Sequence, residues 1–299
     1  MRLLGRVLNA GRIPAPLLFV FGGVSMYVGA AVAVGLFDVA SPAGVAWLRV
    51  SGAAVVLLAW RRPGRAAWRG KVFWLAGLFG VVTALMNVAF YESIDRLPLG
   101  TAVALEFVGP VLVAAFGSRS VRDIGALSLV VSGVVLIADV RWAGSTLGVL
   151  FALSAAVLWA GYIVLGKRVA SLGLGVDGLA VGFGVATVLL SPLAFQAGPV
   201  WTSPRLLVLG VGVGVLSTVV PYALDQVVLR RTGQAAFALL LALLPVTATA
   251  VGLVVLRQVP TLPEALGILA VVVGLTMRTR DRAADPLQPS STRARAARE

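Results

Sequence analysis

The sequence contains neither cysteine nor histidine in its 299 residues. The absence of cysteine excludes disulfides, thiol nucleophiles and CxxC redox pairs, and the absence of histidine excludes HExxH zinc sites and Ser-His-Asp triads. No GxxxxGK[ST] run is present, so the chain does not use ATP through a Walker loop. These absences argue against an enzyme and against a metal or cofactor.

Charged residues are also scarce, at 12% of the chain, while 59% of residues are hydrophobic and the mean hydropathy is +0.99. Soluble proteins carry about 25% charged residues, so water is not the main solvent of this chain. Ten continuous apolar stretches approach the length of about 20 residues that crosses a bilayer as a helix. The sequence therefore predicts an all-α integral membrane protein with spans at 17–36, 41–60, 72–90, 99–116, 123–138, 146–165, 178–195, 206–224, 235–255 and 262–277.

The net charge of +13 would suit a nucleic-acid-binding protein, but the positions of the basic residues indicate membrane topology instead. With the N-terminus in the cytoplasm, the inner segments hold Arg2, Arg6, Arg12, Arg61, Arg62, Arg65, Arg69, Lys71, Arg119, Arg122, Lys167, Arg168, Arg230, Arg231 and the arginines of the tail. The outer segments hold only Arg96, Arg141, Arg205 and Arg257. This asymmetry predicts that both termini are cytoplasmic, and we expect no nucleic-acid partner.

The two ends of the chain differ from the spans. We expect residues 1–13 to form a cytoplasmic segment. No small-residue cleavage site follows a short apolar core, so the first span is expected to remain as an anchor and not to be a removable signal peptide. Residues 278–299 combine Arg, Asp, Pro, Ser and Ala without apolar periodicity. We expect them to be a disordered basic tail in the cytoplasm, with anionic lipid as a potential contact.

The spans divide into two comparable halves of five, at residues 14–138 and 146–277. In the first half Tyr91 is followed by Gly100 and Pro110, and in the second Tyr222 is followed by Gly233 and Pro245. Because each half has an odd number of spans, the two copies must enter the membrane from opposite sides. The sequence thus predicts two inverted five-helix repeats, an arrangement that places transporter sites near the bilayer midplane.

An acidic residue, Glu106, lies within the fourth span. A carboxylate in the membrane costs several kcal/mol unless it is neutralised, paired or facing water, so it indicates ion or substrate handling. Arg49 lies in the second span at nearly the same depth, on the order of 10–12 Å inward at about 1.5 Å per residue. We hypothesise that the two side chains pair, with Glu106 coupling protons and both residues binding substrate. The alternative is a permanent structural pair.

Further candidates share a position within or at the end of a span. Potential substrate contacts are Asn87, Tyr91, Trp159, Tyr162 and Tyr222, although Trp and Tyr also anchor helices at membrane interfaces. Potential gating residues are Gly109, Pro110 and Pro245, because proline removes a helix donor and kinks the helix, while simple packing kinks remain an alternative. Asp225 is expected at the cytoplasmic boundary, either functional, solvated or paired with Arg230.

The stretch from Ala89 to Pro110, AFYESIDRLPLGTAVALEFVGP, resembles the signature of the threonine/homoserine exporter family, in the EamA-domain branch of the drug/metabolite transporter superfamily. In the second half, Val220–Asp225 followed by Arg230 and Arg231 resembles that family's Pro-Tyr-x-x-acid segment. The resemblance covers most of residues 14–277. It implies a ten-helix carrier of the bacterial inner membrane that exports amino acids or related metabolites, in exchange for protons.

One position departs from the family pattern. Relatives commonly have Glu directly before the proline of the ninth helix, where this chain has Leu243-Leu244-Pro245. That difference leaves Glu106 as the principal embedded acid, and it puts in doubt a mechanism that needs one carboxylate in each half.

These observations favour a gradient-driven exporter of small amino acids such as threonine or homoserine, working by alternating access between the halves. Its partners would be a small-molecule substrate, protons and the lipid bilayer. A drug or nucleotide-sugar carrier of the same superfamily is the first alternative. A non-transporting scaffold or a lipid-modifying membrane enzyme is the second, although no catalytic constellation is evident.

Overall fold

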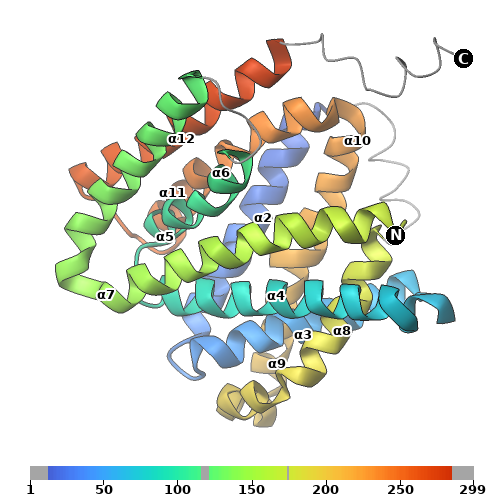
Figure 1. Cartoon of the computed structure of the whole chain (residues 1–299). Coiled ribbons are helices and arrows are strands. Elements are labelled where there is room, and N and C mark those ends of the chain that lie inside the picture. Colours follow the sequence, from blue (N-terminus) through green and yellow to red (C-terminus); the bar gives the residue numbers. More distant parts are fainter. Residues whose placement is uncertain (1–12, 116–120, 174, 285–299) are drawn as a thin grey trace, which may run out of the picture.

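The computed structural model describes residues 13–115, 121–173 and 175–284, and all regular elements in these ranges are helical (Figure 1). The elements are α2 (Ala15–Leu36), α3 (Pro42–Arg61), η1 (Arg65–Trp68), α4 (Gly70–Ile94), α5 (Leu99–Glu106), α6 (Val108–Ala115), α7 (Val121–Ser171), α8 (Gly175–Leu189), η2 (Ser191–Thr202), α9 (Pro204–Gly214), η3 (Val215–Val219), α10 (Val220–Leu241), α11 (Leu243–Val255) and α12 (Leu262–Ala284).

The ends of the chain are only partly described. Nearly all of the predicted N-terminal segment, the inner residue Arg119 and residues 285–299 of the predicted tail lie outside the described ranges. Helix α12 continues to Ala284, so it includes residues 278–284, which we expected to belong to the disordered tail.

Within the described residues, five helices are long and apolar enough to cross a membrane, or six if the bent pair Val176–Leu189 and Ser191–Thr202 counts as one span. Four shorter apolar helices are present at Leu99–Val113, Gly125–Ile137, Leu243–Val255 and Leu262–Met277. Each of the ten predicted spans overlaps one of these helices. The structure is therefore all-helical with several membrane-length helices, and the count of ten crossings stays a prediction.

Local sequence signals explain where two of the long helices begin. Ser41 and Ser203 each precede a proline, and their hydroxyls accept hydrogen bonds from Gly44 N (3.0 Å) and Leu206 N (3.5 Å). A serine N-cap satisfies one of the free amide groups of the first turn, and proline at the first helical position needs no hydrogen bond of its own. The Ser-Pro pairs therefore fix the starts of α3 and α9.

The longest element contains two predicted spans. Helix α7 is interrupted by non-helical backbone at Ser145 (φ −158°, ψ 68°), which corresponds to the sharp bend of α7 in Figure 1. The bend falls between predicted spans 123–138 and 146–165. The chain changes direction there. Gly133, before the bend, packs against α12, and Gly166, after the bend, packs against Phe79 of α4.

Helices from the two predicted halves pack against each other. Helix α7 contacts α4, α5, α6 and α12, helix α2 contacts α10 and α11, and α3 contacts α8 and α9. Some crossings are backbone to backbone: a β-carbon added to Gly80 of α4 would lie 2.0 Å from the carbonyl carbon of Gly182 in α8. Small residues at such crossings allow the close approach that stabilises helices in membranes.

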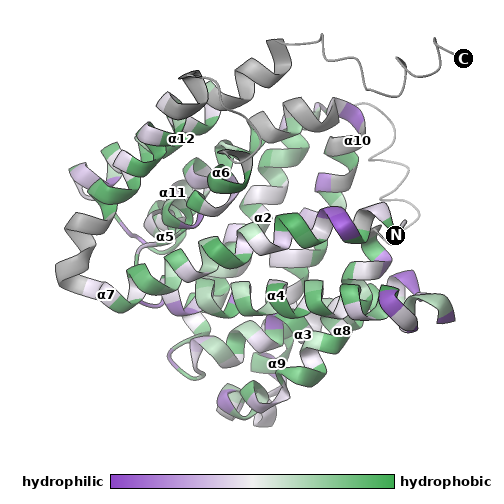
Figure 2. Ribbon diagram, viewed as in Figure 1, coloured by the Kyte–Doolittle hydropathy of each residue, from purple (hydrophilic) through white to green (hydrophobic). Residues whose placement is uncertain are grey.

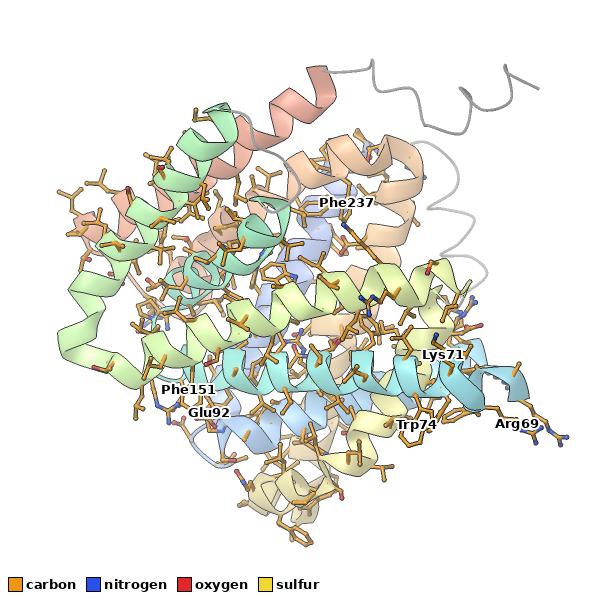
Figure 3. The ribbon with its side chains drawn as sticks, in the orientation of Figure 1. Arg69, Lys71, Trp74, Glu92, Phe151 and Phe237 are labelled. Atoms are coloured by element: carbon orange, nitrogen blue, oxygen red, sulfur yellow. The ribbon has the colours of Figure 1, made fainter. Side chains whose placement is uncertain are left out.

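The surface has the pattern of a membrane protein. Large apolar side chains are exposed along the helices, including Trp74 (74% exposed) and Val254 (77%), and apolar residues dominate the ribbon in Figure 2. Charged groups gather at helix ends, where Arg69 and Lys71 lie at one end of α4 and Glu92 at the other (Figure 3). We call the end with Glu92 and Arg96 the outer end, following the predicted topology.

We expect Gly80→Ala to destabilise the protein, because the added methyl group would overlap the backbone of Gly182. Overpacking of this kind costs about 1–3 kcal/mol. The melting temperature of the purified protein in detergent should fall. Gly35→Ala in α2 is the matched control, since nothing lies within 4 Å of its β-carbon position, and an equal loss in both variants would contradict the crossing.

Candidate functional site

Glu106 is the last residue of α5, where the fourth predicted span is broken. Phe107 caps α5 and α6 begins at Val108. Proline at position 110 explains the break, because proline has no N–H to donate to the carbonyl four residues earlier, which is that of Glu106. The carboxyl group therefore lies at a discontinuity, the type of helix that forms ion and substrate sites in transporters.

The same break occurs in the second half. Helix α10 ends at Leu241 and α11 begins at Leu243, and Pro245 has the same relation to Leu241 as Pro110 has to Glu106. The kinks expected at Pro110 and Pro245 are both present as helix breaks. Gly109 has a packing role as well, because a β-carbon there would lie 2.0 Å from the carbonyl oxygen of Ala156 in α7.

Glu106 is buried, with 7% of its surface exposed, and so are all other residues of α5. Arg49 is 8% exposed and is the eighth residue of α3, counting from Pro42, as Glu106 is the eighth of α5, counting from Leu99. The two residues thus occupy equivalent positions in two helices that begin at the outer end.

Arg49 is held by neutral groups of a π-helix. Its Nε donates to Thr218 Oγ1 (3.2 Å) and its Nη2 to the carbonyl oxygen of Ser217 (3.0 Å), both in η3, which is a π-helix. Its guanidinium carbon lies 5.4 Å from the centre of the Tyr91 ring, a cation–π distance. Single π-helical turns are frequent at functional sites, and this one supplies the acceptors of the buried cation.

Two serines fix this π-helix against α2. Ser25 Oγ donates to the Leu216 carbonyl oxygen (2.9 Å), and Ser217 Oγ donates to the Met26 carbonyl oxygen (3.1 Å). A β-carbon on Gly29 of α2 would lie 2.2 Å from Ser217 Oγ. The close approach of α2 therefore holds η3, and through it the position of Arg49.

The hypothesised direct pair of Arg49 with Glu106 is not formed in this structure. Among the described residues, the ion pairs within 4.0 Å join Arg61 to Asp177 and Arg96 to Glu92 and Asp95. Arg49 and Glu106 interact electrostatically without such contact. The neutral oxygens of η3 bind the guanidinium instead, so the two opposite charges remain separate within one buried region.

Two tyrosines complete this charged centre. Tyr91 is fully buried, and its hydroxyl makes no hydrogen bond of good geometry among the described residues, although it lies close enough to Arg49 and Ser217 to interact with both. Tyr27 of α2 is 3% exposed and interacts electrostatically with both Glu106 and Arg49. Sequence reasoning missed Tyr27, although its place in the middle of the first span, away from the interfaces where tyrosine is common, was a usable signal.

Trp159 and Asn87, which were also predicted to bind substrate, have no described contact with Arg49 or Glu106. Trp159 packs edge to face on Phe107, the neighbour of Glu106, with ring centres 4.8 Å apart. Asn87 lies one turn from Tyr91 on α4, but its amide donates to the Thr83 carbonyl oxygen of its own helix (2.9 Å). Trp159 therefore borders the charged centre, whereas Asn87 is engaged locally.

Tyr162 and Tyr222 form a second group. Tyr162 stacks on Phe79 with ring centres 5.0 Å apart and interacts electrostatically with Tyr222 and Asp225. Both tyrosines pack against one hydrophobic cluster that includes Val50 and Phe79. The contacts described for Tyr162 and Tyr222 lie within this cluster, so the substrate-binding role expected for these two tyrosines stays a prediction.

Comparison with known proteins agrees with this architecture. Residues 146–280 match the EamA-like transporter family. The threonine/homoserine exporter RhtA of Salmonella typhimurium is 34% identical over 264 residues, which is 86% of this chain and 89% of that protein, and RhtA of Escherichia coli K12 is 33% identical over the same shares. The chain belongs to the threonine/homoserine exporter family of EamA-like transporters. It is a membrane transporter and not an enzyme.

A solved crystal structure has the same fold as this chain. It aligns with a TM-score of 0.59 at 21% identity, over 89% of this chain and 97% of that chain.

We expect Pro110→Ala to restore an amide donor for the Glu106 carbonyl and to join α5 to α6. The melting temperature should rise by about 2–4 °C per kcal/mol gained, while transport slows because the break is lost. Thermal unfolding and flux in liposomes measure the two effects. Pro42→Ala at the first position of α3, where no donor is needed, is the control, and a stabilised variant with normal flux would argue against a gating role.

Proposed function

We propose that this chain exports threonine, homoserine or a related small amino acid across the bacterial inner membrane, in exchange for protons. The observation that carries the proposal is the buried, unpaired arrangement of Arg49 and Glu106 in a member of the exporter family. The substrates in the names of the relatives, threonine and homoserine, are zwitterions with one group for each of these charges.

The substrate carboxylate would bind Arg49. A guanidinium has five donors, and its bonds to Thr218 and Ser217 use one on Nε and one on Nη2, so donors remain for an incoming anion. Both existing partners are neutral and leave the positive charge uncompensated. A carboxylate would provide the charge-assisted bond that a buried cation lacks.

The substrate ammonium group would bind Glu106, which accepts no hydrogen bond from the residues that the structure describes. Tyr27 and Tyr91 would line the same space, with Trp159 behind Phe107. The Tyr91 hydroxyl, buried without a hydrogen bond of good geometry among these residues, is suited to the side-chain hydroxyl of threonine or homoserine. Burying that substrate hydroxyl without such a partner would cost about 1–3 kcal/mol.

Competition at Glu106 would couple the substrate to protons. From the cytoplasm, the ammonium group would bind the ionised carboxylate. At the outer side, a proton would neutralise Glu106 and release the substrate, and the protonated carrier would return and lose its proton inside. A carboxyl group that holds either ligand, but not both, gives exchange without further machinery.

Alternating access would come from two inverted five-helix halves, residues 14–138 and 146–277, with ten membrane crossings and both termini in the cytoplasm. The paired breaks before Pro110 and Pro245 support this plan, because each half then contains one discontinuous helix. The arginine asymmetry of the loops supports the orientation.

Reconstituted liposomes test the coupling. The protein should move labelled threonine or homoserine when a pH gradient is imposed, and Glu106→Gln should lose gradient-driven flux by at least about tenfold, because an amide cannot exchange a proton. Glu92→Gln, which breaks an ion pair at the outer end of α4, is the control and should retain flux. Full coupling in Glu106→Gln would remove the proton role.

Arginine at position 49 is tested separately. Arg49→Lys should raise the KM for substrate by about tenfold or more, because lysine cannot reproduce the forked geometry that serves η3 and a carboxylate together. Arg61→Lys, in a half-exposed pair with Asp177, is the matched control with little expected effect. An unchanged KM in Arg49→Lys would exclude carboxylate binding there, and absence of flux for a broad metabolite panel would favour a scaffold.

A further inference from the structure

A second buried carboxylate, Glu264, lies at the outer end of the bundle. It is 0% exposed and is the third residue of α12. Its Oε2 accepts hydrogen bonds from Thr261 N (2.9 Å) and Thr261 Oγ1 (2.8 Å), and its Oε1 accepts one from Thr101 Oγ1 (2.8 Å). Glu264 therefore connects the start of α12 to α5, the helix that ends in Glu106.

The two bonds from Thr261 to Glu264 have a local explanation. Thr261 and Glu264 have the spacing of a capping box, in which the acid three residues into a helix returns to the amide of the cap residue. The bond from Thr101 is not part of a capping box. It joins the first predicted half of the chain to the second, and both side chains are buried, with Thr101 1% exposed.

A second bond joins the same two segments. Pro98 offers no side-chain cap to α5, and the Leu99 amide donates to Gln258 Oε1 instead (2.9 Å). Two backbone features position Gln258. The preceding residue, Arg257, has left-handed backbone (φ 56°) although it is not glycine, and Gln258 N donates to the Gly252 carbonyl oxygen (2.9 Å). The left-handed conformation of Arg257, which most residues avoid, thus places the Gln258 side chain where it caps α5.

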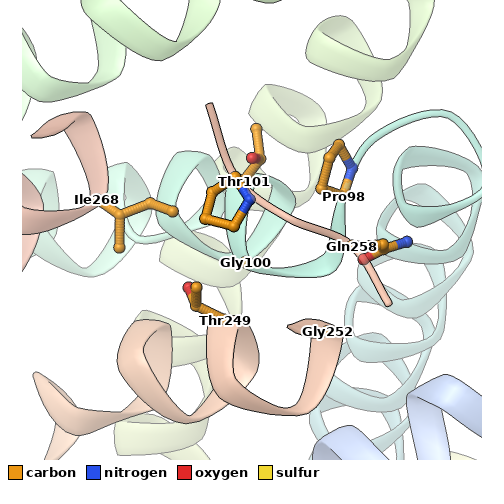
Figure 4. Close-up of a pocket in the computed structure, with 8 residues that line it drawn as sticks. Pro98, Gly100, Thr101, Thr249, Gly252, Gln258 and Ile268 are labelled. Atoms are coloured by element: carbon orange, nitrogen blue, oxygen red, sulfur yellow. The ribbon is translucent and has the colours of Figure 1, made fainter. Parts of the chain in front are cut away.

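The helices behind these bonds are in close contact. A β-carbon on Gly100 would lie 2.3 Å from Thr249 Oγ1 and 2.9 Å from Thr249 Cα, so α5 crosses α11 backbone to backbone. The small pocket between them is lined in part by Thr101, Thr249 and Gln258 (Figure 4). The outer ends of the two halves are therefore closed against each other in this structure.

We propose that the Thr101–Glu264 and Leu99–Gln258 bonds form an outer latch, and that Glu264 is a positioning residue for Glu106. The inference rests on the proposed alternating access. Helix α5 is eight residues long, with the latch at its outer end and Glu106 at its inner end before the proline break. Release of the latch lets this short helix move away from α11 and opens Glu106 to the outside.

The chain's lack of cysteine gives a direct test, because one introduced thiol is the only target of a thiol reagent. Ala102→Cys is placed one turn outward of Glu106 on the same face of α5, at a fully buried position. A membrane-impermeant maleimide is applied from the outside to vesicles containing the full-length protein. Its rate of labelling measures how often the outer side opens.

In this background, Thr101→Val removes the latch donor and keeps the capping box. The labelling rate should rise about tenfold, the equivalent of one lost hydrogen bond to a charged group. Thr101→Ser keeps the hydroxyl and should label like the parent. Thr187→Val is the matched control, because the Thr187 hydroxyl donates only within α8, to the Phe183 carbonyl oxygen (2.8 Å).

An unchanged labelling rate in Thr101→Val, or an equal rise in Thr101→Ser or Thr187→Val, overturns the latch. Thermal unfolding of each variant shows that it is folded, and Thr261→Ser, which retains both donors to Glu264, supplies a second folded comparison. Threonine flux in the same vesicles is scored separately. A parent protein without flux overturns the proposed function, whereas the labelling comparison still decides on the latch.

Discussion

Burial of a guanidinium and a carboxylate in one apolar bundle, without contact between them, is the constraint on which the rest of the site depends. Removing either charge from water costs several kcal/mol unless new partners replace the lost hydration. Arg49 obtains them from the Ser217 carbonyl and the Thr218 hydroxyl, which requires the π-helix, and the π-helix in turn is held by α2. Three helices are thereby arranged around one cation.

The position of Glu106 follows from proline chemistry. Pro110 deprives the Glu106 carbonyl of its helical donor, so the chain breaks directly after the acid, and Pro245 produces the same break after Leu241. A continuous helix would hold the carboxyl group rigidly against its neighbours. Two short helical pieces on either side of a break can change their relative angle at low cost, which suits the ligand-binding role proposed for Glu106.

The ten apolar stretches, the two proline breaks and the shared depth of Arg49 and Glu106 could be predicted from the sequence, because helix periodicity and the rise per residue decide them. The partners of Arg49 could not. Opposite charges at equal depth suggested a salt bridge. The π-helical turn at Val215–Val219 binds Arg49 instead, and no pattern in the sequence predicts this turn. Glu264 was missed for a similar reason, since its importance depends on which helices meet, whereas the position of Tyr27 in the middle of the first span could have singled it out.

The two buried carboxylates show why an embedded acid alone does not identify a coupling site. Glu264 accepts three hydrogen bonds and links two segments, so its charge is part of the structure, and a ligand could bind only by breaking those bonds. Glu106 accepts none from the described residues, faces Arg49 at a distance and ends a short helix. The second half lacks an acid before Pro245, and Glu264 is a poor replacement, because its described hydrogen bonds would have to break before it could bind a ligand. In the proposed cycle, Glu106 exchanges ligands and Glu264 holds the latch, and the eight-residue helix α5 between them would couple binding to opening.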